Sequence, residues 1–257
     1  MALVLGLFTA LGFGIGDFLA GFATRRIPAM AVVFTANIIG GTFLLIAALI
    51  LGGQVNGVDI LWAASAGVAL GLGSLTYYRA LASGCMGLVA ALAGMWSALI
   101  PFCVGLFLGE RPAFLAIGGV MIETVAITLV SGNASKKKKR RHSFRRVSLG
   151  LAEATLAGML FGLFFILLDQ AQGSDAIFAT AAVMLAAAVT VMVPVLFISQ
   201  PLRLTRELMV TAVGVGICSG LATLCFVLAV RNGLLSLVAV AGALSPIPTA
   251  ACARLFL

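Results

Sequence analysis

The chain has 257 residues, of which 62% are hydrophobic and 9% charged, and its mean hydropathy is +1.21. A soluble domain of this length cannot hide so much apolar surface in one core, so the composition excludes a soluble globular protein and indicates lipid as the solvent. The formal charge of +8 does not indicate nucleic acid as a partner, because eight of the 16 basic residues lie in one stretch, from Lys136 to Arg146.

Apolar stretches long enough to cross a bilayer follow one another along the chain. A spanning helix needs about 20 mostly apolar residues, and windows of that length predict nine spans: 2–23, 28–51, 60–82, 85–108, 112–131, 148–168, 176–199, 208–230 and 234–257. The breaks between them are short and rich in glycine, proline or charge, so successive helices are expected to be antiparallel. The first span has no basic segment before it and is interpreted as a helix, not as a cleavable signal peptide.

The positions of lysine and arginine predict the orientation. These residues resist translocation and gather on the cytoplasmic side. If the basic linker 132–147 is cytoplasmic, 14 of the 16 basic residues share its side, and only Arg111 and Arg231 lie outside. The sequence therefore predicts a multi-pass protein of the cytoplasmic membrane, with its N-terminus outside and the linker inside.

An internal repeat is visible at an offset of 149 residues. Residues 67–108 align with 216–257 without a gap and with 13 identities, where apolar composition alone gives roughly one in ten. Five spans fit inside the offset, and an odd number inverts the second copy in the membrane, as in many transporters.

The predicted fold is therefore an all-α membrane protein with nine visible transmembrane helices from two inverted five-helix repeats. The first repeat covers 1–131, the basic cytoplasmic linker 132–147, and the second repeat, with four helices, 148–257. A tenth helix is missing from the second repeat, and the interpretation favoured is a truncated chain.

Three short motifs resemble a known family. They are Leu106-Phe-Leu-Gly-Glu110, Ser245-Pro246-Ile-Pro248 and the glycine-rich stretch 14–21 around Asp17. With the repeat, they make the chain similar to EamA-type members of the drug/metabolite transporter superfamily. Two departures are Ser97, where the family often has proline, and the absence of a second Gly-Glu. The resemblance implies secondary transport of a small metabolite or drug-like solute by alternating access, and the chain has no phosphate-binding loop that would indicate ATP use.

Acidic residues inside spans are the main candidates for function, because a charge in the bilayer is costly unless it is paired or hydrated. Glu123 lies near the middle of its span, and Asp17 lies nearer the cytoplasmic end of the first. We expect one or both to bind a cationic group of the solute or to exchange a proton during transport. A buried structural hydrogen bond is the alternative for each.

Polar and aromatic residues add weaker binding candidates. Asn37 shares its helix face with glycines, and Trp96 lies mid-span, where an indole N–H needs a partner or a cavity. Packing against lipid is the alternative for Trp96. Tyr77 and Tyr78 lie near the cytoplasmic end of the third span, where interfacial anchoring is the alternative.

Prolines and glycines predict two further features. Pro246 and Pro248 are expected to interrupt the last span, and interrupted helices often line a transporter's site. Glycines spaced four apart, at 67 and 71 and at 216 and 220, predict that the third and eighth spans approach closely.

Metal and cofactor chemistry is not expected. The five cysteines lie in apolar stretches, and the single histidine, His142, lies in the basic run without a partner at ligand spacing. Two alternatives to a carrier remain: a membrane-embedded enzyme acting on a lipid-linked substrate, and a non-transporting subunit or sensor. The prediction is a non-enzymatic carrier whose partners are a small solute and the lipid bilayer; a homodimer is compatible with it.

Overall fold

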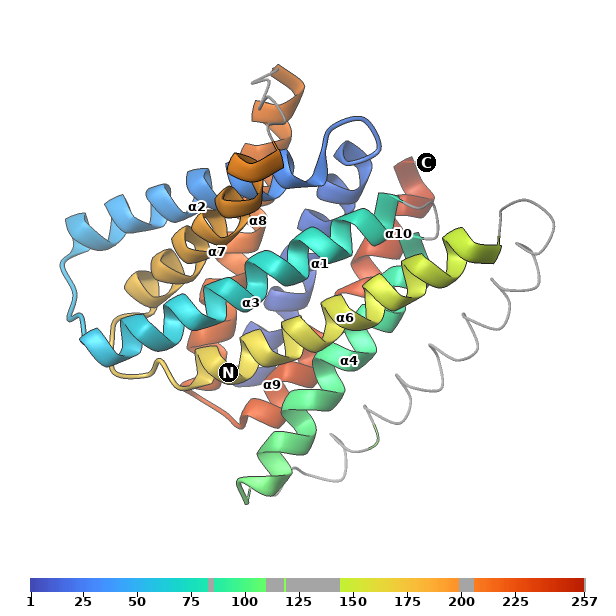
Figure 1. Cartoon of the computed structure of the whole chain (residues 1–257). Helices are drawn as coiled ribbons and strands as arrows, with labels where there is room; N and C mark the ends of the chain where they lie inside the picture. Colours follow the sequence, from blue (N-terminus) through green and yellow to red (C-terminus); the bar gives the residue numbers. More distant parts are fainter. Residues whose placement is uncertain (83–85, 110–117, 119–143, 199–205, 257) are drawn as a thin grey trace.

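The chain forms a bundle of helices in a computed structural model that describes residues 1–82, 86–109, 118, 144–198 and 206–256 (Figure 1). Its helices are α1 (Ala2–Ala23), α2 (Ala29–Leu51), α3 (Gly57–Ala82), α4 (Met86–Phe107), α6 (Phe144–Asp169), α7 (Ala176–Ile198), α8 (Arg206–Val230), α9 (Leu235–Gly242) and α10 (Pro246–Phe256). No strand occurs within these described ranges.

Eight helical stretches in the described part of the chain are long and apolar enough to cross a membrane, with α9 and α10 together supplying the eighth. The chain is therefore an all-α, multi-pass membrane protein. The predicted span 112–131 lies outside the described residues, apart from Gly118. α6 begins at Phe144, so its first turn overlaps the end of the predicted linker 132–147. No glycine or proline occurs in 144–147 to oppose that extra helical turn.

The outside of the bundle is apolar, as a lipid solvent requires. Large side chains of α1 are exposed along its length: Leu3, Val4, Leu7, Phe8, Leu11, Ile15 and Phe22. Small residues such as Ala20, Ala63 and Ala66 are buried without any exposed surface. Small interior residues let membrane helices pack closely, whereas a soluble bundle would bury its large apolar side chains.

Proline and glycine determine where α2 begins and ends. Pro28 precedes its first turn, where a fixed φ suits the helix and a missing N–H breaks no bond. Gly52 follows its last residue with a φ of +68°, a conformation that other residues rarely adopt. The chain can therefore reverse within residues 52–56 and enter α3.

Glycines also mark the closest helix crossings. A Cβ added at Gly216 of α8 would lie 2.5 Å from the carbonyl oxygen of Ala36 in α2, and one added at Gly67 of α3 would lie 2.7 Å from Ala186 Cβ in α7. The prediction that these glycines join the third and eighth spans is therefore wrong. Each glycine face instead packs against a helix from the other half of the chain, so α3 packs on α7 and α8 on α2.

The two ends of the bundle contain different segments. The Met1 end consists of Met1 and the loops 52–56, 170–175 and 231–234; the Arg79 end consists of residues 24–28, the end of α3 and the start of α8. At the Met1 end, Asp175 donates its N–H to the Gln54 carbonyl at 3.0 Å. At the Arg79 end, Arg26 and Arg206 line one surface groove. Consequently α3 runs from the Met1 end to the Arg79 end, and α8 runs the opposite way.

Candidate solute-binding site

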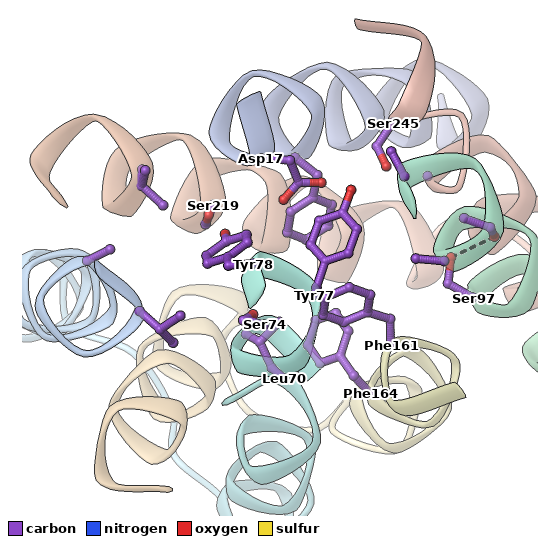
Figure 2. Close-up of a pocket in the computed structure, with 18 of the residues that line it drawn as sticks. Asp17, Leu70, Ser74, Tyr77, Tyr78, Ser97, Phe161, Phe164, Ser219 and Ser245 are labelled. Atoms are coloured by element: carbon purple, nitrogen blue, oxygen red, sulfur yellow. Dashed lines mark hydrogen bonds between the residues drawn. The ribbon is translucent and has the colours of Figure 1, made fainter. Parts of the chain in front are cut away.

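A cavity lies inside the described bundle (Figure 2). It offers about 60 Å³ to the centres of water-sized molecules, which is room for roughly five waters. Side chains of α1, α2, α3, α4, α6, α7 and α8 line it, together with the junction of α9 and α10. Both halves of the chain therefore contribute to its wall.

Asp17 and Tyr77 form the polar centre of this cavity. Asp17 lies on α1, and Tyr77 and Tyr78 lie on α3. The Thr24 hydroxyl, directly after α1, donates a hydrogen bond of 3.5 Å to the Tyr78 carbonyl and so joins the ends of the two helices. Figure 2 shows the Tyr77 hydroxyl and the Asp17 carboxylate facing each other on the cavity wall. The tyrosines are 3% and 5% exposed, which does not fit the alternative of interfacial anchors.

Asn37 adds an amide to the wall from α2. Its side chain is 8% exposed, and its Nδ2 donates a hydrogen bond of 2.8 Å to the Val33 carbonyl one turn earlier. Because this bond uses one of the two amide N–H groups, Asn37 can offer its amide oxygen and its second N–H to a solute.

The last predicted span is broken beside the cavity. α9 ends at Gly242 and α10 begins at Pro246, the position at which the prolines predict an interruption. The Thr249 hydroxyl donates to the Gly14 carbonyl of α1 at 3.0 Å, and a Cβ added at Gly14 would lie 2.6 Å from the Ser245 carbonyl oxygen. The break therefore packs tightly on α1, one turn before Asp17, and contributes Ser245 to the wall.

The structure brings together four of the six residues predicted to bind solute or protons: Asp17, Asn37, Tyr77 and Tyr78. Trp96 is not among the lining residues. It lies at the crossing of α4 with α6, where a Cβ added at Gly158 would lie 2.7 Å from the Trp96 Cβ. Glu123 lies outside the described residues. Pro246 and Pro248 belong to the helix that follows the break and do not themselves line the cavity.

Sequence reasoning missed the hydroxyls and rings of the wall. The serines at 74, 219 and 245 and the phenylalanines at 13, 161, 164 and 165 all line it. In a membrane helix these residue types are ordinary, so their identity alone carries no signal. Helical spacing could have found some of them, because Leu70, Ser74 and Tyr77 recur at the interval that places residues on one face.

The chemistry that this wall offers is recognition of a solute. It presents a carboxylate, phenols, hydroxyls and an amide to a space surrounded by apolar rings. Within the described residues, no three His, Cys, Asp or Glu side chains gather as a metal site requires. The described cysteines at 103, 218, 225 and 252 are free thiols.

Comparison with known proteins identifies the fold alone. No protein-family model matches the chain. No curated protein matches its sequence. Sixteen chains of solved structures resemble it. One of them, a crystal structure described only as that of a protein, superposes with a TM-score of 0.75 over 99% of this chain and 89% of its own length. The two sequences are 18% identical, so the likeness extends to the architecture and no further.

Proposed function

We propose that the chain is a secondary transporter that moves a small solute across the cytoplasmic membrane by alternating access. The observation that carries the proposal is the cavity around Asp17 and Tyr77, enclosed by both halves of a membrane-embedded bundle. An ionisable group held inside a bilayer is costly, and it is retained where it serves a solute or ion pathway.

Two inverted repeats are part of the proposal, and the helix bounds support them. Shifted by 149 residues, α3 corresponds to 206–231, against Arg206–Val230 for α8, and α4 corresponds to 235–256, the range spanned by α9 and α10. The packing is also reciprocal. At this offset α1, α2 and α3 correspond to α6, α7 and α8. In the first half α1 packs on α8 and α3 packs on α7. The corresponding pairs, α6 on α3 and α8 on α2, also pack together. Because α3 and α8 run in opposite directions, the second copy is upside down relative to the first.

Inversion supports alternating access for a physical reason. Two copies related by an axis in the membrane plane can form the same set of contacts with the cavity open to either side, so the two states have similar energies. Hydrogen bonds join the loops 52–56 and 170–175 at the Met1 end. Arginines 25, 26, 79 and 206 lie at the Arg79 end, which supports a cytoplasmic location for that end.

The family that the chain resembles supports the same activity. EamA-type members of the drug/metabolite transporter superfamily imply a carrier of small metabolites or drug-like solutes. Proton coupling through Asp17 or Glu123 is compatible with this activity.

Counterflow in proteoliposomes tests the proposal with a mixture of solutes, so that no single solute has to be chosen in advance. Vesicles that contain the purified protein and an unlabelled metabolite extract are placed in a ¹³C-labelled extract, and mass spectrometry identifies what enters. We expect one class of small solute to exchange, and Asp17→Asn to abolish that exchange. Glu153→Gln is the matched control, because this acid-to-amide change lies on α6 outside the cavity lining.

The enzyme and sensor alternatives predict a different result. Neither a membrane-embedded enzyme acting on a lipid-linked substrate nor a sensor exchanges solutes across a vesicle membrane. Wild-type vesicles that take up no more label than protein-free vesicles would therefore refute the transporter proposal.

A further inference from the structure

The cavity wall has one carboxyl group and, among the described lining residues, no basic side chain to pair with it. Asp17 is the one carboxylate among the described lining residues, and no lysine, arginine or histidine is among them. An ionised carboxylate in a lipid-embedded site needs a proton or a bound cation to neutralise it. An anionic solute would add a second unpaired negative charge, so phosphorylated and carboxylate solutes do not fit this wall.

Aromatic rings cover much of the remaining wall. Phe161 meets Tyr77 edge-on with ring centroids 5.5 Å apart. Phe13 and Phe164 lie beside Phe165, with centroids 6.4 and 5.0 Å from its ring. Such rings bind an apolar body by dispersion, and their faces attract a cation. An alkyl or aryl group can lie against these rings without leaving a polar group unpaired.

Hydroxyl groups lie on the same side of the cavity as Asp17. Ser74, Ser219 and Ser245 line the cavity, and Figure 2 shows Ser219 and Ser245 on opposite sides of Asp17. A protonated amine has N–H groups to donate to a carboxylate and to neighbouring hydroxyl oxygens at once.

We infer that the solute is a small protonated amine with an aromatic or aliphatic body. Its ammonium group binds Asp17, and its body lies against the rings of α1, α3 and α6. This inference rests on the proposed transport function, because it names the class of solute that the same cavity carries.

A series of probes that share one body and differ in charge tests this inference by binding alone. The probes are 2-phenylethylamine, 2-phenylethanol and phenylacetate, with ethylamine as the probe without a ring. Thermal unfolding of the purified protein is followed as each probe is titrated. We expect 2-phenylethylamine to stabilise the protein most, and Asp17→Asn to weaken its binding by roughly tenfold or more, because a charge-assisted hydrogen bond is lost.

Controls separate loss of binding from loss of folding. Tyr77→Phe keeps the carboxylate and the ring but removes the phenol hydroxyl that faces Asp17, so it should weaken binding by only a few fold. Glu153→Gln should bind the amine like the wild type. Equal or stronger stabilisation by phenylacetate or phenylethanol, or unchanged amine binding in Asp17→Asn, would overturn the inference. If counterflow detects exchange of another solute class while the amine fails to bind, the solute class is wrong and the transport function stands.

A second, independent feature joins three loops at the Met1 end. We name it the loop latch, and it is formed by Gln54, Asn56, Ser174, Asp175 and Arg231. The Gln54 N–H donates to Asp175 Oδ2 at 3.2 Å, in addition to the bond of 3.0 Å in the reverse direction. Ser174 Oγ accepts from the Asn56 N–H at 2.8 Å and donates to the Asn56 carbonyl at 3.4 Å. The Arg231 guanidinium donates to the Ser174 carbonyl. The latch thereby ties loops from both halves of the chain.

Two buried polar atoms beside the latch make no hydrogen bond: Asp59 Oδ2 and Arg231 Nε. Asp59 is 6% exposed, and a Cβ added at Gly173 would lie 2.7 Å from its Oδ2, so the carboxylate faces the 170–175 loop. Buried polar groups without partners destabilise the arrangement that contains them. The hydrogen bonds of the latch stabilise this arrangement, whereas the two unpaired atoms destabilise it. Such a balance is expected of an element that can adopt two arrangements.

We infer that the loop latch is the gate of the Met1 end, and that it opens when the cavity becomes accessible from that side. The test uses spin labels at Val55→Cys and Gln172→Cys, two exposed positions on facing loops, in a cysteine-free chain. Ser174→Ala removes both bonds made by the Ser174 hydroxyl. We expect this variant to increase the population at long label distances by roughly tenfold, since each hydrogen bond contributes to closure.

Asn232→Ala is the matched control for the latch. Its side chain also lies in a Met1-end loop, but its Nδ2 bonds only locally, to the Leu228 carbonyl at 2.7 Å. The distance distribution should therefore stay at its wild-type form. If Ser174→Ala and Asn232→Ala give the same distribution as the wild type, the latch is not a gate. This measurement needs no solute, so it can fail while the transport function stands.

Discussion

Replacing Gly216 by alanine should destabilise the bundle at one defined crossing. The added Cβ would lie 2.5 Å from the Ala36 carbonyl oxygen and 3.2 Å from the Gly40 nitrogen. Both neighbours are backbone atoms, so no side-chain rotation can relieve the overlap. Because real Cβ atoms essentially never approach another atom within 3.0 Å, α2 and α8 must separate by at least 0.5 Å. Overpacking of this kind costs about 1–3 kcal/mol, and loosened contacts along the crossing favour the upper part of that range.

The control lies two residues away on the same helix. A Cβ added at Gly214 would meet only Leu19 Cδ1, at 3.3 Å, and that methyl group can rotate away. Gly214→Ala should therefore be neutral or gain up to about 1 kcal/mol from helix propensity. Unfolding in a titration with sodium dodecyl sulfate, followed by circular dichroism, gives both free energies. The reasoning fails if Gly216→Ala is as stable as Gly214→Ala. Gly67→Ala, at the equivalent position of the first half, should lose a similar amount if the two halves are repeats.

Three further predictions concern the break, the indole and the orientation. Thr249→Val should lose about 1 kcal/mol of unfolding free energy, because it removes the bond to the Gly14 carbonyl; Thr180→Val, whose hydroxyl bonds only within α7, should lose less. Trp96→Phe should leave counterflow at the wild-type rate. A rate as low as that of Asp17→Asn would show that the indole takes part in solute binding. In a cysteine-free chain, a membrane-impermeant maleimide added to intact cells should label Gln54→Cys but not Arg25→Cys, and the reverse pattern would invert the proposed orientation.

Hydropathy predicts where the helices are better than which faces meet. The predicted span 60–82 corresponds to α3, which begins only three residues earlier, because an apolar run of spanning length has few other structures available in lipid. The partner of each helix was harder to predict. A membrane helix has no polar stripe that faces water, so its packing face depends on the fit of small residues. The glycines of α3 and α8 were therefore recognised as packing residues but assigned to the wrong neighbours.

The candidate site was predictable where its chemistry is rare in a bilayer. Asp17 is notable in the sequence because a charge within an apolar span is costly, and the structure places it beside Tyr77 on the cavity wall. Ser219 and Phe161 belong to residue types that membrane helices use everywhere, so only the folded chain distinguishes them. Trp96 is not among the lining residues, since a mid-span indole can lie in a helix crossing as well as in a cavity.

The side chains of the cavity do not follow the repeat, and this difference bears on how a solute is oriented. At the offset of 149 residues, Asp17 corresponds to Ile166, and Tyr77 corresponds to Phe226. If the halves are inverted copies, the first provides the carboxylate and the phenol, and the equivalent positions of the second are apolar and are not among the residues that line the cavity. Phe226 stacks on Phe165 with ring centroids 4.4 Å apart, on the side of the Met1 end. If the chain is the carrier that we propose, a solute with a charged group and an apolar body would keep one orientation through the transport cycle, with its charge held by α1 and α3 in both states. The empty carrier would then have to neutralise Asp17 each time it changed state, and the cation or proton that did so would select the ion to which transport is coupled.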